Sequence, residues 1–252
     1  MQSIRLLSYN IHKGFSPGNS SFILHNIRDA IRELETDIVC LQEVVGAHSG
    51  HQQSIDDWHD GGQFEFLADS IWPHFAYGKN AIYQQGHHGN AILSKYPFSY
   101  WENLDISRWK FSQRGILHGR IGTNLHLLCI HFGFLPIEQR FQLNQLKELV
   151  HNQIPLTDGL IIAGDFNDWH HRIHRVLTRE LHLKEAISHK SNRPKATYPA
   201  SRPWLAMDRI YYRNVKLESA STLNHRHWQR LSDHCPVIAD FSLTSRISSH
   251  VM

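Results

Sequence analysis

The sequence predicts an α/β protein in which β-sheets are covered by helices on their outer faces. Apolar residues recur at strand spacing in some segments and at helix spacing in others, and the two periodicities alternate along the 252 residues. Strand-like segments outnumber helix-like ones, which favours sheets with dispersed helices packed outside them. Because no internal repeat or low-complexity linker divides the chain, we expect a single domain over residues 1–252 with a core at about residues 3–243.

The strands are expected where short apolar runs end in polar or turn-forming residues. In chain order, these runs are Ile4–Tyr9, Asp37–Gln42, Ala91–Leu93, Ile116–Ile121, Leu125–His131, Leu160–Ala163, Met207–Tyr212 and Pro236–Phe241. Helices are expected where apolar residues recur every three or four positions, in segments 22–34, 64–72, 137–150 and 171–181. Residues 46–62 are polar and glycine-rich, so we expect a long loop there, and such loops are often functional.

Composition excludes several classes of protein. Seven Trp, eight Tyr and twelve Phe are too many aromatic residues for a disordered chain, and three cysteines are too few for a disulfide scaffold. Cys40 and Cys129 lie inside apolar runs, which predicts buried free thiols and a cytoplasmic location. No apolar run approaches the roughly 18 residues of a transmembrane segment. The formal net charge of +3 gives no indication of a nucleic-acid-binding protein.

Polar side chains gather at the ends of the expected strands. Four strands are followed by polar residues and two are preceded by them. The residues that follow strands are Asn10, Glu43, His131, Asp165 and Asn167, and those that precede strands are Asp208, Asp233 and His234. If the last two strands run antiparallel to the others, all of these side chains meet at one edge.

The chemistry of these residue types points to a hydrolase. Carboxylate and amide oxygens suit a hard cation, Mg²⁺ or Mn²⁺, and neighbouring Asp and His side chains suit general acid–base catalysis. Together they predict metal-assisted hydrolysis of a phosphate ester.

Five motifs in this order resemble the endonuclease/exonuclease/phosphatase superfamily, which is deoxyribonuclease I-like. They are SYNIHKG, LQEV, the histidine of CIHFG, GDFN, and SDHCPV preceded by MDRI, and they span most of the chain. Residues 88–97 (HGNAILSKYP) look most like small bacterial members of uncertain substrate. The resemblance implies a four-layered sandwich, with two mostly antiparallel β-sheets packed face to face and helices on the outside. That architecture agrees with the strand directions inferred above.

The resemblance also implies metal and water-activating residues. Glu43 matches the metal-binding glutamate of the family, with Asn10 and Asp233 close by in the metal and phosphate shell. Asp165 and Asn167 match the pair that orients or activates the attacking water and holds a phosphate oxygen.

Two histidines complete the implied catalytic set. His234 matches the active-site histidine, and Asp208 matches the aspartate that orients its ring. His131 matches a second histidine that deoxyribonuclease-like and sphingomyelinase-like members share. The abasic-site branch lacks it, which argues against abasic-site repair.

Other polar residues allow two interpretations. Arg114 can clamp a phosphate or lie on the surface, Asn90 can bind substrate or fix a turn, and His88 is a candidate for the rim of the site. Residues 190–204 hold four basic residues and no acidic one, which fits either a substrate-binding loop or a solvated loop. The further histidine clusters fit surface positions better than a zinc site, because no cysteine or carboxylate pattern completes one.

We therefore expect a Mg²⁺- or Mn²⁺-dependent phosphoric ester hydrolase. Its substrate is a phosphate ester of nucleic acid, of a lipid or inositol-phosphate headgroup, or of a small molecule. No obligate protein partner is evident. A non-catalytic binding or interaction module on the same fold is the alternative, and it is disfavoured because no expected acid or histidine is missing.

Overall fold

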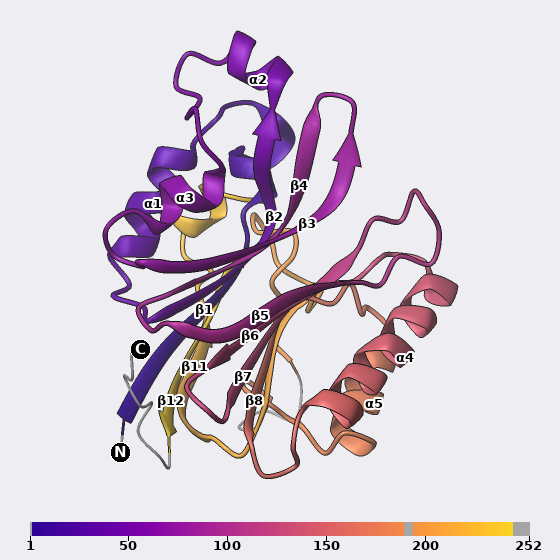
Figure 1. Ribbon diagram of the computed structural model, residues 1–252. Coiled ribbons are helices and arrows are strands. Elements are labelled where there is room, and N and C mark those ends of the chain that lie inside the picture. The colour runs from indigo at the N-terminus through magenta and orange to yellow at the C-terminus, as the bar shows by residue number, and fades with distance from the viewer. Residues whose placement is uncertain (1, 189–193, 244–252) are drawn as a thin grey trace.

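The computed structural model describes residues 2–188 and 194–243, which form two six-stranded β-sheets (Figure 1). The first sheet consists, in spatial order, of β11 (Lys216–Thr222), β12 (Val237–Leu243), β1 (Gln2–Asn10), β2 (Ile38–His48), β4 (Gly86–Ser94) and β3 (His74–Tyr83). The second consists of β5 (Phe98–Asp105), β6 (Gly115–Ile121), β7 (Leu125–His131), β8 (Gly159–Asp165), β10 (Asp208–Arg213) and β9 (Lys184–Glu185).

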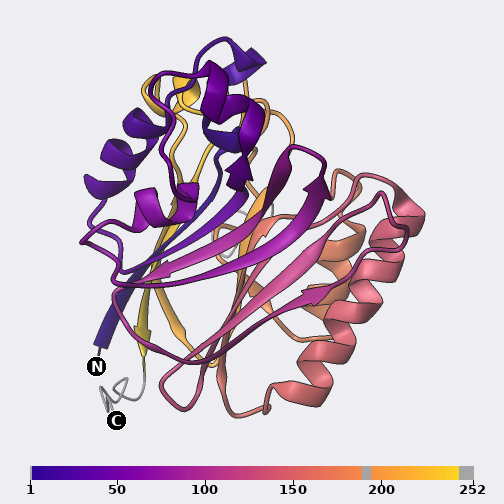
Figure 2. The same ribbon diagram turned by 45° about the horizontal axis from the view of Figure 1, so that its top comes forward.

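Helices cover the outer face of each sheet. The α-helices are α1 (Leu24–Arg32), α2 (Ser49–Ser54), α3 (Gln63–Ala68), α4 (Pro136–Gln153) and α5 (Arg172–Arg179). The short 3₁₀ helices are η1 (His12–Gly14), η2 (Pro17–Asn19) and η3 (Trp228–Arg230). In Figures 1 and 2, α1 and α3 lie on the first sheet, whereas α4 and α5 lie on the second. Among the described residues, no helix combines the length and the apolar character that crossing a membrane requires.

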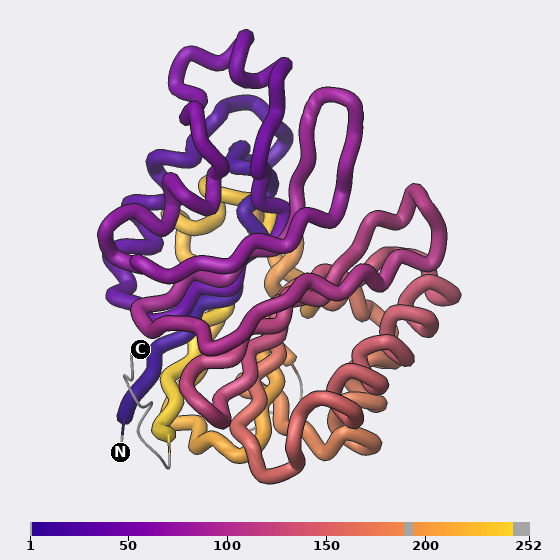
Figure 3. Tube along the Cα trace, viewed as in Figure 1, coloured from indigo at the N-terminus to yellow at the C-terminus, as the bar shows by residue number. Residues whose placement is uncertain are grey.

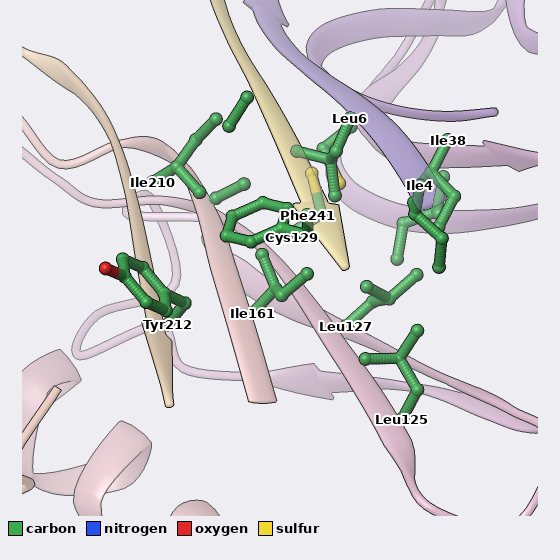
Figure 4. Packing of buried hydrophobic residues seen from close by; sticks show 14 of the residues in the cluster. Ile4, Leu6, Ile38, Leu125, Leu127, Cys129, Ile161, Ile210, Tyr212 and Phe241 are labelled. Atoms are coloured by element: carbon green, nitrogen blue, oxygen red, sulfur yellow. The ribbon is translucent and has the colours of Figure 1, made fainter. Parts of the chain in front are cut away.

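Three apolar layers separate the four structural layers. One lies between the sheets, where Leu6 and Phe241 of the first sheet face Leu127 and Ile161 of the second (Figure 4). A second lies under α4 and α5, and a third lies under α1 and α3. Because side chains alternate along a strand, Leu6 packs between the sheets while Leu7 packs under the helices. The four-layered sandwich implied by the sequence is confirmed.

Strand directions bring the polar strand ends to one edge. β1 pairs parallel with β2 and antiparallel with β12. In the second sheet, β7 pairs parallel with β8, and β10 pairs antiparallel with β8. The ends of β1, β7 and β8 therefore lie beside the starts of β10 and β12, as the sequence argument required.

The prediction of a long loop over residues 46–62 is wrong for the first half of that segment. β2 continues to His48, because Val45 and Ala47 pair with the polar start of β4. α2 follows at once, and its first turn is capped by the His48 ring, whose Nδ1 accepts a hydrogen bond from the backbone N–H of His51 at 3.0 Å. Strand pairing and a side-chain cap thus impose regular structure on residues whose composition favours a loop.

Candidate active site

A β-bulge in β2 directs Glu43 toward the edge where the strand ends meet. The pairing of β2 with β4 shifts between Leu41 and Val44, so Glu43 lies in the irregular segment. Its φ is 57°, a left-handed conformation that is uncommon for residues other than glycine. Bulges re-aim side chains and are frequent next to active sites, and here the bulge places the carboxylate on the wall of a cleft.

The side chain of Asn10 connects the two sheets at this edge. Its Nδ2 donates a hydrogen bond to Asp165 Oδ2 at 3.2 Å and lies 3.5 Å from Glu43 Oε1. Its Oδ1 accepts a hydrogen bond from the backbone N–H of His12 at 3.1 Å. A single buried amide therefore holds a carboxylate of the second sheet close to a carboxylate of the first.

Strand register places three polar residues side by side in the second sheet. Asp165 is paired with His131 on β7 and with Asp208 on β10. His131 Nε2 lies 3.5 Å from Asp165 Oδ2 and makes no hydrogen bond within the described part of the chain. Burial, assisted by nearby positive charge on Arg114, lowers the pKa of His131 well below its usual value, so its ring is neutral at pH 7.

His234 lies between two aspartates. Its Nδ1 is 2.8 Å from Asp208 Oδ2, and its Nε2 is 3.8 Å from Asp165 Oδ2. Burial alone would lower the pKa of His234, but Asp208 and Asp165 outweigh burial and raise it to about 10. The ring is therefore an imidazolium that donates from Nδ1 to Asp208.

The pKa of Asp165 is raised as well, which for a carboxyl group favours the neutral form. Burial, with a contribution from Asp208, raises the pKa of Asp165 to about 7, although His234 and the hydrogen bonds from Asn167 and Asn10 oppose the shift. The site therefore contains an acid–base group poised near neutral pH beside a charged imidazolium.

The same three side chains are spaced as metal ligands. One ligand atom each from Asp165, Asp208 and His234 lies within 4.8 Å of the other two, and all three residues are buried. Asp208 Oδ1 is buried and has no hydrogen-bond partner among residues 2–188 and 194–243. Two carboxylates and a neutral imidazole form a donor set that divalent cations accept, so His234 would have to lose a proton to join it.

A cleft of about 220 Å³ opens above these residues. Its lining combines the polar residues Glu43, Asp165, Asn167, Asp233 and His234 with the largely apolar residues Phe134, Trp169, Tyr198 and Met207. The Tyr198 ring lies 4.8 Å from the His234 ring, centroid to centroid. The cleft thus combines charged groups with aromatic rings.

A smaller cavity shares Glu43 with the cleft. It is lined by Glu43, Asn80, His88, Gly89, Asn90, Gln113, Arg114 and His131, and its volume of about 10 Å³ is close to that of one water molecule. Arg114 Nε and His88 Nδ1 are buried without a hydrogen-bond partner in the described structure. Burial and the charge of Lys13 lower the pKa of His88 to about 4.

The structure brings all the sequence-predicted residues to this region. All but Asn10 and Asp208 line one of the two cavities, and these two are hydrogen-bonded to residues that do.

Two of the predicted amide side chains donate hydrogen bonds to backbone carbonyls and so hold chain segments together. Asn90 Nδ2 donates to the carbonyls of Gly115 and Cys129, at 3.1 and 3.3 Å. Asn167 Nδ2 donates to the carbonyl of Phe132 at 2.9 Å.

Sequence reasoning missed a buried ion pair behind the site. Arg209 Nη1 lies 3.0 Å from Asp168 Oδ2, and both residues are fully buried. Arg209 Nη2 also donates to the carbonyls of Asp168 and Ala206, at 2.9 and 2.8 Å. The pair ties the turn that carries Asn167 to the start of β10. The signal was present in the sequence, because an arginine inside the apolar run MDRIYY needs a buried partner.

Only residues 194–204 of the basic segment 190–204 belong to the described structure. Lys190 and Arg193 lie outside the described residues. Tyr198, in the same segment, lines the cleft. Lys13, which the sequence analysis did not select, places Nζ 3.9 Å from Glu43 Oε2.

Known proteins share this fold and sequence pattern. The protein YbhP of Escherichia coli (strain K12), described as uncharacterised, is 43% identical over 246 residues, which cover 96% of this chain and 97% of YbhP. The structure resembles an endonuclease/exonuclease/phosphatase from Beutenbergia cavernae DSM 12333, with a TM-score of 0.72, 17% identity, and coverage of 96% of this chain and 72% of that one. It also resembles an endonuclease/exonuclease/phosphatase family protein from Leptotrichia buccalis C-1013-b, with a TM-score of 0.74, 14% identity, and coverage of 95% and 100%.

The comparison of family models gives the same result. A model described as the endonuclease/exonuclease/phosphatase family matches residues 7–234. That range begins in β1 and ends at His234, so it contains the whole constellation around Asp165. The chain therefore belongs to the endonuclease/exonuclease/phosphatase family.

Proposed function

We propose that the protein is a Mg²⁺- or Mn²⁺-dependent phosphoesterase that hydrolyses its substrate by in-line attack of water. The observation that carries this proposal is the buried Asp165–His234–Asp208 cluster at the base of a cleft, which Asn10 joins to Glu43. A carboxylate with a pKa of about 7 beside an imidazolium is an arrangement suited to proton transfer.

The proposed metal ligands are Glu43 and Asp233, with Asn10 beside them. Both carboxylates line the cleft, and Asn10 lies 3.5 Å from Glu43 Oε1. The donor set consists of oxygen atoms, which hard cations prefer. The bound cation would neutralise charge on a non-bridging phosphate oxygen.

The remaining site residues have proposed roles in proton transfer and phosphate binding. Asp165 or His234 activates the attacking water, and the other steadies the phosphoryl oxygens. Asp208 orients the His234 ring, while Asn167 fixes the position of Asp165 through its backbone N–H, which donates to Oδ1 at 3.1 Å. His131, whose Nε2 makes no hydrogen bond within the described structure, holds the phosphate or protonates the leaving group.

Arg114, His88 and Asn90 are proposed to bind substrate from the smaller cavity. The support is strongest for Arg114, because its buried Nε has no hydrogen-bond partner in the described part of the chain and the residue lines the smaller cavity together with Glu43. Asn90 contributes mainly by holding β4 against β6 and β7, since its amide nitrogen already bridges two carbonyls.

Nucleic acid and lipid or inositol-phosphate headgroups are the alternative substrate classes. We also propose a cytoplasmic location. All three cysteines lie in the described chain as free thiols, which supports a reducing compartment. A non-catalytic binding module remains the alternative function, and the following experiment separates it from an enzyme.

The test is a substrate panel with the Glu43→Gln variant. The panel contains bis-p-nitrophenyl phosphate, plasmid, an oligonucleotide, phospholipid and inositol phosphate, each with Mg²⁺ or Mn²⁺ and with excess chelator. We expect turnover that chelator abolishes and that needs at least about tenfold more metal in Glu43→Gln, because the variant keeps the shape but loses the ligand charge.

Glu148→Gln serves as the control, since Glu148 is exposed on α4 away from the cleft. Full activity in excess chelator, or a wild-type metal requirement in Glu43→Gln, would contradict the metal assignment. No turnover of any phosphate ester, with retained binding of one of them, would favour the binding module.

A further inference from the structure

Five large apolar side chains are exposed around the cleft on the side of the second sheet. We name them the apolar ridge: Phe111 is 75% exposed, Phe134 55%, Leu135 51%, Ile137 57% and Trp169 45%. They come from the β5–β6 connection, the start of α4 and the turn after β8. Exposed apolar side chains gathered beside a cleft indicate an interaction site.

The segments of the apolar ridge are held together by specific contacts. Phe134 and Trp169 both line the catalytic cleft and so adjoin the site directly. Ser112 donates a hydrogen bond from Oγ to Glu138 Oε1, which fixes the β5–β6 connection to α4. Figure 3 shows this connection beside the start of α4. The two segments that carry Phe111 and Ile137 are therefore adjacent.

The surroundings of the ridge are basic. Arg108, Lys110, Arg140 and Arg172 are exposed within or next to the ridge segments. Residues 106–114 and 133–142 carry Glu138 as their single acidic residue, and Glu138 is buried. The surface therefore combines exposed apolar side chains with positive charge, so its complement is an anionic surface with an apolar interior.

A cavity of about 220 Å³ between α4 and α5 extends the same chemistry. Leu143, Ile173 and Val176 contribute apolar walls, and Arg140 and Arg172 contribute guanidinium groups. An apolar cavity with two cations beside it suits an anionic amphiphile rather than a free sugar or a base.

The composition of the ridge separates lipid from nucleic acid. Aromatic side chains can stack on bases, but the aliphatic side chains of Leu135 and Ile137 cannot. Both aliphatic and aromatic side chains, flanked by Lys and Arg, are the residues that enter the boundary between headgroups and acyl chains.

We propose that the apolar ridge binds the protein to an anionic phospholipid surface. Binding there would bring the phosphodiester of a lipid headgroup to the cleft. This part of the proposal rests on the proposed phosphoesterase function. Surface binding itself requires no catalysis, so the two can fail independently.

The experiment measures co-sedimentation with vesicles in the presence of chelator, so that no turnover occurs. Wild-type protein is mixed with phosphatidylglycerol-containing vesicles or with pure phosphatidylcholine vesicles. The test variant is Phe111→Ser with Ile137→Ser, neither of which lines the cleft. The control is Leu156→Ser. Leu156 is 79% exposed and lies just beyond the far end of α4 from Ile137, and this 18-residue helix is roughly 27 Å long.

We expect wild type and Leu156→Ser to bind anionic vesicles equally and zwitterionic vesicles weakly, and the double variant to bind anionic vesicles at least tenfold more weakly. Hydrolysis of soluble bis-p-nitrophenyl phosphate should be the same in all three proteins. The proposal is overturned by absent vesicle binding or by equal binding in the double variant. It is also overturned if the ridge substitutions instead abolish self-association or oligonucleotide binding. Vesicle binding without any phosphoester hydrolysis would uphold the surface and contradict the proposed function.

Discussion

One oxygen atom of Asp165 organises the site at the scale of single residues. Asp165 Oδ2 lies 3.2 Å from Asn10 Nδ2, 3.5 Å from His131 Nε2 and 3.8 Å from His234 Nε2. These groups come from both sheets, so a small shift of either sheet changes the electrostatic environment of the carboxylate. The raised pKa of Asp165 therefore depends on the packing of the whole sandwich as well as on its neighbours.

The Asp208–His234 pair should act as a unit. We expect His234→Ala to lower kcat by about a thousandfold or more and Asp208→Asn to lower it somewhat less. The double variant should be within a few-fold of His234→Ala, because Asp208 acts only through the ring that it holds at 2.8 Å. Steady-state kinetics of the three variants measures this coupling. Multiplicative losses in the double variant would show that Asp208 has a separate role.

The sequence revealed the residues that carry the proposed chemistry better than the residues that hold them in position. Asn10, Glu43 and Asp165 could be selected because a polar residue at the end of an apolar strand has no place in a core. Arg209 inside an apolar run indicates a buried partner, but that partner, Asp168, lies 41 positions away, and no local pattern identifies it. The left-handed φ of Glu43 also arises from strand pairing, which one chain segment alone does not reveal.

At the scale of elements, the strands that sequence periodicity missed lie at the edges of the sheets. β3 and β11 border the first sheet, and β5 borders the second. Much of each strand is exposed, as in β11, where no residue is fully buried. Edge strands bury little apolar surface, so alternation is weak in segments such as KLESAST. Central strands were all detected, and Leu125–His131 was predicted with its observed bounds. The predictions for β2 and β4 covered only part of each strand, because both strands continue into polar segments that pair with each other.

A buried histidine pair links β6 to β7 away from the active site. His118 Nε2 and His126 Nδ1 are 2.9 Å apart, and His126 Nε2 lies 3.2 Å from Asp158 Oδ2. Burial lowers the pKa of both rings, to about 4 for His118, although Glu102 and Asp158 oppose the shift. Arg120 and Arg213 add positive charge that disfavours protonation further.

This pair should make folding stability depend on pH. Since the folded pKa values are lower than the unfolded value, the pair stabilises the fold fully above about pH 6.5, and its contribution is lost as pH falls toward 4. Urea unfolding measures how much the free energy of unfolding falls between pH 7 and pH 4.5. We expect this fall to be smaller, by on the order of 2 kcal/mol, in the double variant His118→Asn with His126→Asn than in wild type. His151→Asn, an exposed control, should leave the loss unchanged. An equal loss in the double variant and wild type would refute the assignment.

At the scale of the whole molecule, the two sheets share one apolar layer. Phe241 of β12 is fully buried and lies 5.4 Å from the Tyr212 ring of β10, centroid to centroid. The sheets therefore cannot separate without exposing this layer. From the residues alone, the sequence predicted sheets with outer helices, whereas the number of layers came from family resemblance, because face-to-face packing of sheets depends on contacts distant in the chain.

Phe241→Ala tests whether the chain unfolds as one unit, as the single-domain prediction requires. We expect a loss of about 3–5 kcal/mol in the free energy of unfolding, because the substitution leaves a cavity between the sheets. Guanidinium unfolding followed by fluorescence and by circular dichroism should give one coincident transition in both proteins. Two separated transitions would show that the sheets are independent folding units.

The ends of the described chain lie opposite the catalytic edge. Gln2 of β1 is paired with Leu243 of β12, while Asn10, at the other end of β1, reaches the site. A nine-residue strand spans roughly 30 Å. A biotin tag or sensor-chip linker attached beside Leu243 would therefore hold the molecule with its cleft facing solution. Immobilised in this orientation, the protein could be presented to vesicles in flow without the support covering the catalytic face.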